Sequence, residues 1–143
     1  MLKQVLTLVF VVSIMVSTAS AAVDGDTRIV APNHHKLPNI KVSCGEKISV
    51  NAELQQYGLK KIVLWQSPIP KHEWSSQVLR YLELGVFDNK GDIIFTDQAR
   101  TKLINGEAHF DKFKLNTPGV YTCYIKYTGD IKHCQTQFQI YVT

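Results

Sequence analysis

The sequence predicts an all-β fold, a single antiparallel β-sandwich of about seven to eight strands. After Pro38, apolar and polar residues alternate in short runs, which is the pattern of strands with one buried face. Glycine, proline, asparagine and aspartate separate these runs at short intervals, as expected for turns. No long window has a convincing helical pattern, although residues 75–84 would allow one short helix. Short strands with regular turns are typical of a sandwich.

Length and composition limit the class of protein. The chain has 143 residues, of which 45% are hydrophobic and 20% charged, with 8 glycines and 5 prolines. This composition suits one globular domain and excludes a disordered or collagen-like chain. The formal net charge is +4, but the basic residues are scattered and the longest basic run is Lys60-Lys61. We therefore expect no nucleic-acid binding.

The N-terminal segment, residues 1–21, has the three parts of a secretory signal peptide. Lys3 precedes an apolar run over residues 5–16, and small residues follow at 19–21. The apolar run is shorter than the roughly 20 residues that a membrane-spanning helix needs. We therefore expect an extracellular protein with no membrane span after cleavage; an uncleaved membrane anchor is the alternative.

The next segment, residues 22–38, is expected to be a flexible or edge-lying arm that precedes the sandwich domain at 39–143. It contains Asp24-Gly25-Asp26 and two prolines, and it has little apolar periodicity. Ile29 and Val30 would add a first strand, which Pro32 would end.

Within the domain we expect strands at residues 48–54, 59–65, 78–87, 92–95, 102–104, 108–113, 120–127 and 138–142. Trp65 would be a core residue at the end of the second of these. Pro68 and Pro70 cannot donate to a strand ladder, so residues 66–76 are expected to form a loop or a sheet edge. Residues 88–91 and Asn105-Gly106 are expected to be hairpin turns.

Several spacings resemble those of the immunoglobulin-like superfamily. Gly45 precedes alternating apolar residues that end at Ala52, Trp65 follows, and Tyr121-Thr122-Cys123 matches the start of the sixth strand with its tyrosine corner. The match covers about residues 40–143. Ala52 stands where this family has its first cysteine, and Thr117 stands where it has the corner aspartate. The usual inter-sheet disulfide is therefore not expected.

Local motifs make the likeness more specific. Residues 86–91, 105–110, 118–121 and 127–130 look like those of cysteine-poor immunoglobulin-like modules in microbial and protist surface proteins, which implies adhesion or spacing. Cys44-Gly45 and residues 131–134 together give a fainter resemblance to secreted transthyretin-like proteins of nematodes. That likeness implies a carrier of a small ligand and a disulfide between Cys44 and Cys134.

The cysteine count is odd, since the chain has 3. An extracellular chain with three cysteines forms at most one internal disulfide and keeps one thiol. In the resembled sandwich, the turn before the sixth strand lies at the same end as Cys44. We therefore expect a Cys44–Cys123 disulfide and an exposed free thiol at Cys134.

Catalytic and metal-binding patterns are missing from the sequence. The five histidines show no ligand spacing, and adjacent pairs such as His34-His35 point to opposite sides of an extended strand. There is no nucleophile elbow and no glycine-rich phosphate loop. We therefore predict no catalytic residue, no metal and no cofactor; a small secreted enzyme is a third hypothesis that would require histidines and carboxylates to converge.

The strongest candidate for a binding site is the segment 66–76. It holds Ile69, His72 and Trp74 between prolines and polar residues, and an exposed tryptophan in a stiff loop suits an interface anchor. Trp74 folding back over the open end of the sandwich is the alternative. The sequence therefore predicts a secreted binding or adhesion module, not an enzyme, whose partner is another protein or a cell-surface ligand.

Overall fold

The described chain folds entirely as β-structure in the computed structural model, which describes residues 21–62 and 69–143. The predicted signal peptide, apart from Ala21, and Trp65 lie outside the described residues. The described strands are β1 (Thr27–Val30), β2 (Ile40–Val42), β3 (Lys47–Ile48), β4 (Asn51–Ile62), β5 (Ile69–Ser76), β6 (Tyr81–Phe87), β7 (Ile93–Arg100), β8 (Glu107–His109), β9 (Phe113–Lys114), β10 (Gly119–Tyr127) and β11 (Cys134–Val142). None of the described segments is a helix that is long and apolar enough to cross a membrane.

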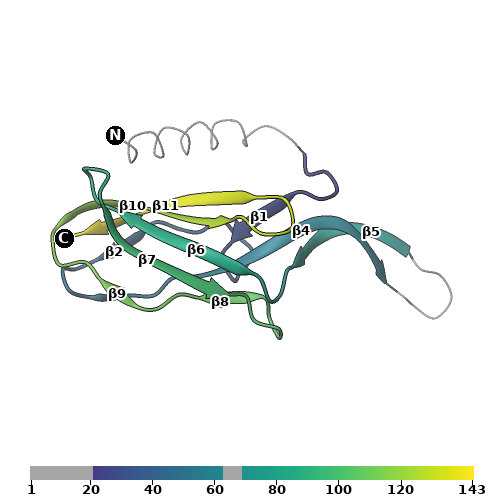
Figure 1. Ribbon diagram of the computed structural model, residues 1–143, viewed down its shortest axis with the longest axis horizontal. Helices are drawn as coiled ribbons and strands as arrows, with labels where there is room; N and C mark the ends of the chain where they lie inside the picture. The colour runs from purple at the N-terminus through teal and green to yellow at the C-terminus, as the bar shows by residue number, and fades with distance from the viewer. Residues whose placement is uncertain (1–20, 63–68) are drawn as a thin grey trace.

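Two sheets form the layers of the sandwich (Figure 1). One sheet has the order β1-β4-β5, and β8 also pairs with β4. The other has the order β2-β11-β10-β6-β7, in which β2 runs parallel to β11 and the other pairs are antiparallel. The short strands β3 and β9 form a separate pair. The predicted all-β sandwich is confirmed.

The core lies between the two sheets, and in β10 and the second half of β11 buried apolar residues alternate with more exposed ones. Leu54 of β4 and Ile125 of β10 are both fully buried in one cluster. Ala52 and Cys123 belong to the same cluster and are also fully buried. The Tyr121 hydroxyl donates to the Thr117 carbonyl at 2.7 Å, which ties the start of β10 to the turn before it.

The first long strand differs from the prediction. Residues 48–54 and 59–65 were expected as two strands, but residues 51–62 form the single strand β4. Gln55 and Gln56 interrupt the apolar alternation without interrupting the strand, because their backbones pair with both β1 and β5. The two glutamines point to opposite faces of the sheet, and the strand continues through them.

The segment after β4 was expected to be a loop or a sheet edge, and its described part, residues 69–76, is a sheet edge. Residues 69–76 are not a loop but the strand β5, which pairs with β4 from Gln55↔Ser76 to Ile62↔Ile69. Pro70 is tolerated because β5 lies at the edge of its sheet. The short helix considered for residues 75–84 is absent, since β5 ends at Ser76 and β6 begins at Tyr81.

The turn at Asn105-Gly106 exists, but it does not close a hairpin. Gly106 has a φ of +70° and its N–H donates to the Lys102 carbonyl at 2.8 Å. The following strand β8 pairs with β4, so the chain crosses here from one sheet to the other. By contrast, the turns at residues 88–91 and 128–130 connect neighbouring strands of one sheet.

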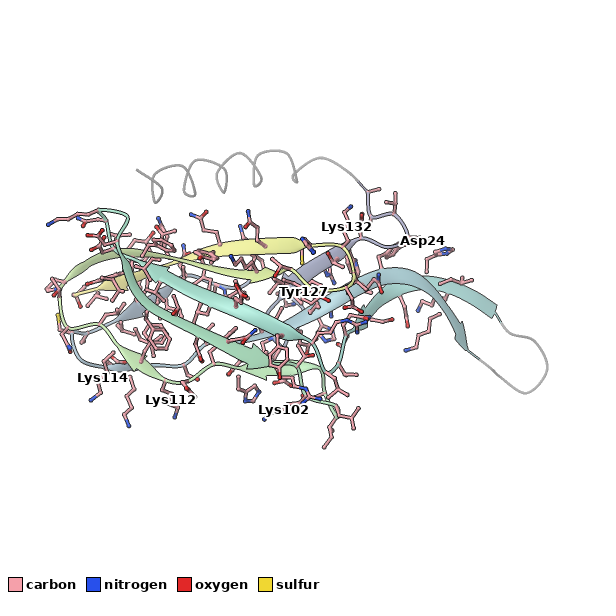
Figure 2. The ribbon with its side chains drawn as sticks, in the orientation of Figure 1. Asp24, Lys102, Lys112, Lys114, Tyr127 and Lys132 are labelled. Carbon is pink, nitrogen blue, oxygen red and sulfur yellow. The ribbon has the colours of Figure 1, made fainter. Side chains whose placement is uncertain are left out.

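The turn between β10 and β11 is held by a small polar cluster. Arg80 donates two hydrogen bonds to the Asp130 carboxylate, at 3.0 and 3.2 Å, and the Tyr127 hydroxyl donates to the same carboxylate. These donors lower the pKa of Asp130 from its ordinary value. Figure 2 shows Tyr127 beside this end of the sheet.

Candidate functional site: the hairpin face

The β4–β5 hairpin extends beyond the rest of its sheet (Figure 1). The pairing of β4 with β1 ends at Thr27↔Gln56, whereas the pairing with β5 continues to Ile62↔Ile69. Directly opposite residues have side chains on the same face of a sheet, and successive residues point to opposite faces. The register therefore assigns each side chain of the hairpin to one of two faces.

The two faces have different chemistry. One face carries the opposed pairs Tyr57↔Trp74 and Leu59↔His72, and we call it the hairpin face. The other face is ionic, because Glu73 lies 3.3 Å from the Lys60 ammonium and 3.8 Å from the Lys71 ammonium. Aromatic and ionic side chains are thus separated across a two-stranded ribbon.

Ring contacts organise the hairpin face. The centroid of the Tyr57 ring lies 5.3 Å from that of Trp74 and 6.1 Å from that of His72. The Arg28 guanidinium, from the neighbouring strand β1, lies 4.1 Å from the centroid of the Trp74 ring. Such aromatic and cation–π contacts are worth about 0.5–1.5 kcal/mol each. They fix the row of rings in place while Tyr57 and Trp74 remain only partly buried.

A buried polar network continues the same face toward the sandwich. Glu53 is 3% exposed, and its Oε2 atom accepts hydrogen bonds from Ser76 Oγ at 3.0 Å and from Gln55 Nε2 at 3.4 Å. His34 Nε2 lies 3.2 Å from the same oxygen. Arg28 Nε donates to Gln55 Oε1 at 2.8 Å. The network therefore connects the buried carboxylate to the guanidinium that packs on Trp74.

His34 reaches this network because of an unusual backbone. Its φ is +68°, a left-handed conformation that few residues other than glycine adopt. Its N–H donates to the Ala31 carbonyl at 2.8 Å and closes a tight turn. The turn places the imidazole over Glu53 while the side chain stays 61% exposed.

The Glu107 carboxylate lies on the strand opposite the buried Glu53. Glu53 of β4 and Glu107 of β8 are direct cross-strand partners, and His109 Nε2 lies 3.2 Å from Glu107 Oε1. Like charges that face each other across a sheet are destabilising. Each carboxylate here has its own histidine, which compensates this repulsion when the ring is protonated.

The structure brings two of the three predicted binding residues together. His72 and Trp74 lie on the hairpin face, on a strand and not on a loop, and His72 Nε2 is 3.3 Å from Asp24 Oδ1. Ile69 is the first residue of β5, but its side chain is outside the described part of the chain. Trp74 does not cover the end of the sandwich; it packs on Tyr57 and Arg28.

Sequence reasoning missed the other members of this face, above all Arg28, Tyr57 and the buried Glu53. A single strand over residues 51–62 would have placed Glu53, Gln55 and Tyr57 on one face, but the apolar pattern changes parity after Leu54 and hides this continuity. Arg28 had no such signal.

The three cysteines are free thiols, so the expected Cys44–Cys123 disulfide and the alternative Cys44–Cys134 disulfide are both absent from the structure. Cys44 is exposed between β2 and β3, Cys123 is buried in the core, and Cys134 is partly buried. The expectation of an exposed Cys134 is thus wrong, because β11 turns this side chain toward the core cluster. The exposed thiol is Cys44.

This arrangement predicts selective alkylation. Burial raises the pKa of Cys123 to about 12 and the pKa of Cys134 to about 11, and the thiolate is the reactive form. Iodoacetamide at pH 8 should therefore modify Cys44 alone in the native protein and all three cysteines in denaturant, as measured by intact mass. A Cys44→Ser variant should show no native adduct. Modification of Cys134 as fast as Cys44 would contradict the prediction.

A metal site does not emerge from the described residues, in which no group of three or more His, Cys, Asp or Glu side chains could hold an ion. The hairpin face instead offers rings, amides and paired charges. Its chemistry suits recognition of an organic ligand.

Comparisons with known proteins give similarity to solved structures but no family. No protein-family model and no curated protein matches the sequence. Among solved structures, the chain is similar to a family 123 glycoside hydrolase from Clostridium perfringens, which was analysed for glycolipid glycan hydrolysis. The sequence identity is 12% and the TM-score is 0.44. The similarity covers 82% of this chain and 27% of that enzyme's chain.

The comparison corrects the function that was expected from the sequence. A binding or adhesion module without catalytic activity, with a transthyretin-like carrier as its alternative, is withdrawn because the matched protein is an enzyme. The expectation that the chain is not an enzyme is withdrawn for the same reason. A similarity of this size assigns neither an activity nor a substrate to the present chain.

Proposed function

We propose that the hairpin face binds a neutral carbohydrate chain. The observation that carries this proposal is the row formed by Trp74, Tyr57 and His72, in which every ring contacts the next and remains partly open to solvent. A pyranose ring has an apolar C–H face and a polar rim of hydroxyls. Flat rings with polar edges match both features.

Charge on the hairpin face favours a neutral ligand. Arg28 is held by Gln55 and by the Trp74 ring, and His72 lies beside Asp24. The Glu53 carboxylate is buried below Ser76 and His34. Among the described side chains of this face no excess of one sign remains to select an anion or a cation, whereas planar amide and guanidinium groups remain at the edge of the rings.

The test measures carbohydrate binding by the emission of Trp74. The chain has 2 tryptophans, so a Trp65→Phe variant leaves Trp74 as the only tryptophan fluorophore. Titration with a panel of neutral oligosaccharides of several pyranose units should change the emission of Trp74 with at least one of them. Calorimetry should then show about tenfold weaker binding for Tyr57→Ala, since one lost ring contact is worth about 1 kcal/mol or more.

Matched variants keep the test decisive. Tyr81→Ala removes another tyrosine, one that is 53% exposed on the opposite sheet, and it should bind as well as the parent chain. His72→Ala removes a side chain that is 51% exposed, so it should disturb the fold less than a Tyr57 or Trp74 variant and reports on binding even if one of those folds poorly. Binding that is absent across the panel, or unchanged in both the Tyr57 and His72 variants, would overturn the proposal.

A further inference from the structure

The loop between β7 and β8 presents two aliphatic side chains to solvent. Leu103 is 68% exposed and Ile104 is 97% exposed, the highest value among the exposed large apolar residues of the described chain. We call these two residues the apolar tip. Isolated exposed apolar residues are common, but adjacent ones at the end of a turn form a protruding surface.

The tip is held rigidly from below. Thr101 is fully buried, its hydroxyl accepts from the Arg80 N–H at 3.0 Å, and its carbonyl accepts from the Leu79 N–H at 2.8 Å. The Lys102 N–H donates to the Glu107 carbonyl at 3.0 Å and closes the turn. Because its base is rigid, the apolar tip loses little conformational entropy on binding.

Leu79, which lies beside this loop, has a strained backbone. It is 47% exposed and has a φ of +58°, a conformation that is unfavourable for a leucine. A strained backbone conformation persists only where the surrounding structure holds it in place, and such residues cluster at functional sites. The Leu79 N–H donates to the Thr101 carbonyl, so this strained, exposed leucine lies beside the base of the apolar tip.

Lysines line the same edge of the molecule. Lys102 precedes the tip, and Figure 2 shows Lys102, Lys112 and Lys114 along one edge. Lys47 is the cross-strand partner of Lys114, so two like charges face each other in the β3–β9 pair. These four exposed lysines form what we call the basic edge, and none makes an ion pair with another described residue.

We propose that the apolar tip and the basic edge dock together on the surface of an anionic lipid bilayer. The tip is convex, so it suits insertion among lipid headgroups better than it suits a flat protein surface. Lysine ammonium groups next to the inserted side chains would contact anionic headgroups. This inference is independent of the hairpin face, which uses none of these residues.

The test uses the chain from Ala21 onward, because the apolar segment before it could itself bind lipid. This shorter chain contains every described strand and core residue. Circular dichroism first verifies that this chain is folded. It should sediment with vesicles of phosphatidylcholine and phosphatidylserine at about 0.1 M salt, and much less at about 0.5 M salt or with phosphatidylcholine alone.

Two double variants separate the contributions. Leu103→Ser with Ile104→Ser should weaken binding about tenfold or more, because two aliphatic side chains no longer insert. The matched control is Ile93→Ser with Ile94→Ser, two residues that are 51% and 47% exposed on β7, and it should bind normally. Lys112→Ala with Lys114→Ala should weaken binding about tenfold.

Three results would overturn the proposal. The first is no sedimentation with anionic vesicles at low salt. The second is equal binding by the Leu103/Ile104 variant and the Ile93/Ile94 control. The third is binding of heparin that depends on the lysines without any vesicle binding, which would make the basic edge a site for a soluble polyanion.

Discussion

Replacing Glu53 by alanine is expected to lower the free energy of unfolding by about 2–3 kcal/mol, because it removes the acceptor at the centre of a buried network. Gln55 is 2% exposed and its Nε2 group would lose the Glu53 oxygen that lies 3.4 Å away. A buried donor without an acceptor costs its full desolvation energy. Ser76 and His34 are exposed and can bond to water instead, so Gln55 carries most of the cost.

Urea unfolding followed by circular dichroism measures this effect. Glu107→Ala is the matched control, because Glu107 faces Glu53 across the strands but is only partly buried. Its loss should cost less than about 1 kcal/mol. A Glu53→Ala variant within about 0.5 kcal/mol of the parent chain would show that the network contributes no stability.

The same variant should loosen the hairpin face. Gln55 holds Arg28 by a 2.8 Å hydrogen bond, and Arg28 packs 4.1 Å from the Trp74 ring centroid. Without Glu53, Gln55 can turn away and release the guanidinium. Emission of Trp74 in the Trp65→Phe background should then shift to the red, toward that of a solvated indole, even under conditions where the protein stays folded.

The strands that sequence reasoning placed well depend on local signals. β6 with β7, and β10 with β11, are hairpins whose turns contain glycine and aspartate. The buried positions of β10 alternate regularly, whereas β7 was predicted only as far as residue 95 and continues to Arg100. Such hairpins need little long-range information. Gly91, with a φ of +82°, supplies the left-handed residue that the first of these turns requires.

The candidate site could not be found in this way, because its residues meet through strand pairing. Arg28, Glu53 and Trp74 come from three strands and become neighbours only when the registers of β1 and β5 against β4 are known. Glu53 and Gln55 on β4 are polar because they belong to this network. Their polarity interrupts the apolar pattern from which one continuous strand would have been predicted. Lysines scattered in the sequence likewise gather on one edge only in the fold (Figure 2).

The largest gain in stability is expected from adding a disulfide between the sheets. The resemblance to immunoglobulin-like domains places Ala52 where that family has the cysteine that pairs with the one at Cys123. Ala52 on β4 and Cys123 on β10 are both fully buried in one core cluster, on facing sheets. An Ala52→Cys variant should therefore form a disulfide with Cys123.

A bond that closes a loop of about 70 residues should stabilise the fold by about 3–4 kcal/mol, since it restricts the unfolded chain. The thiols must be oxidised during refolding, because burial raises the pKa of Cys123 to about 12 and suppresses its reaction in the native state. Peptide mapping should find the Ala52→Cys position joined to Cys123, and the thermal midpoint should rise by about 10 °C relative to the reduced form. An Ala52→Ser variant should show no such redox dependence, and bonding to Cys44 or Cys134 instead would show that β4 and β10 do not face each other at these residues.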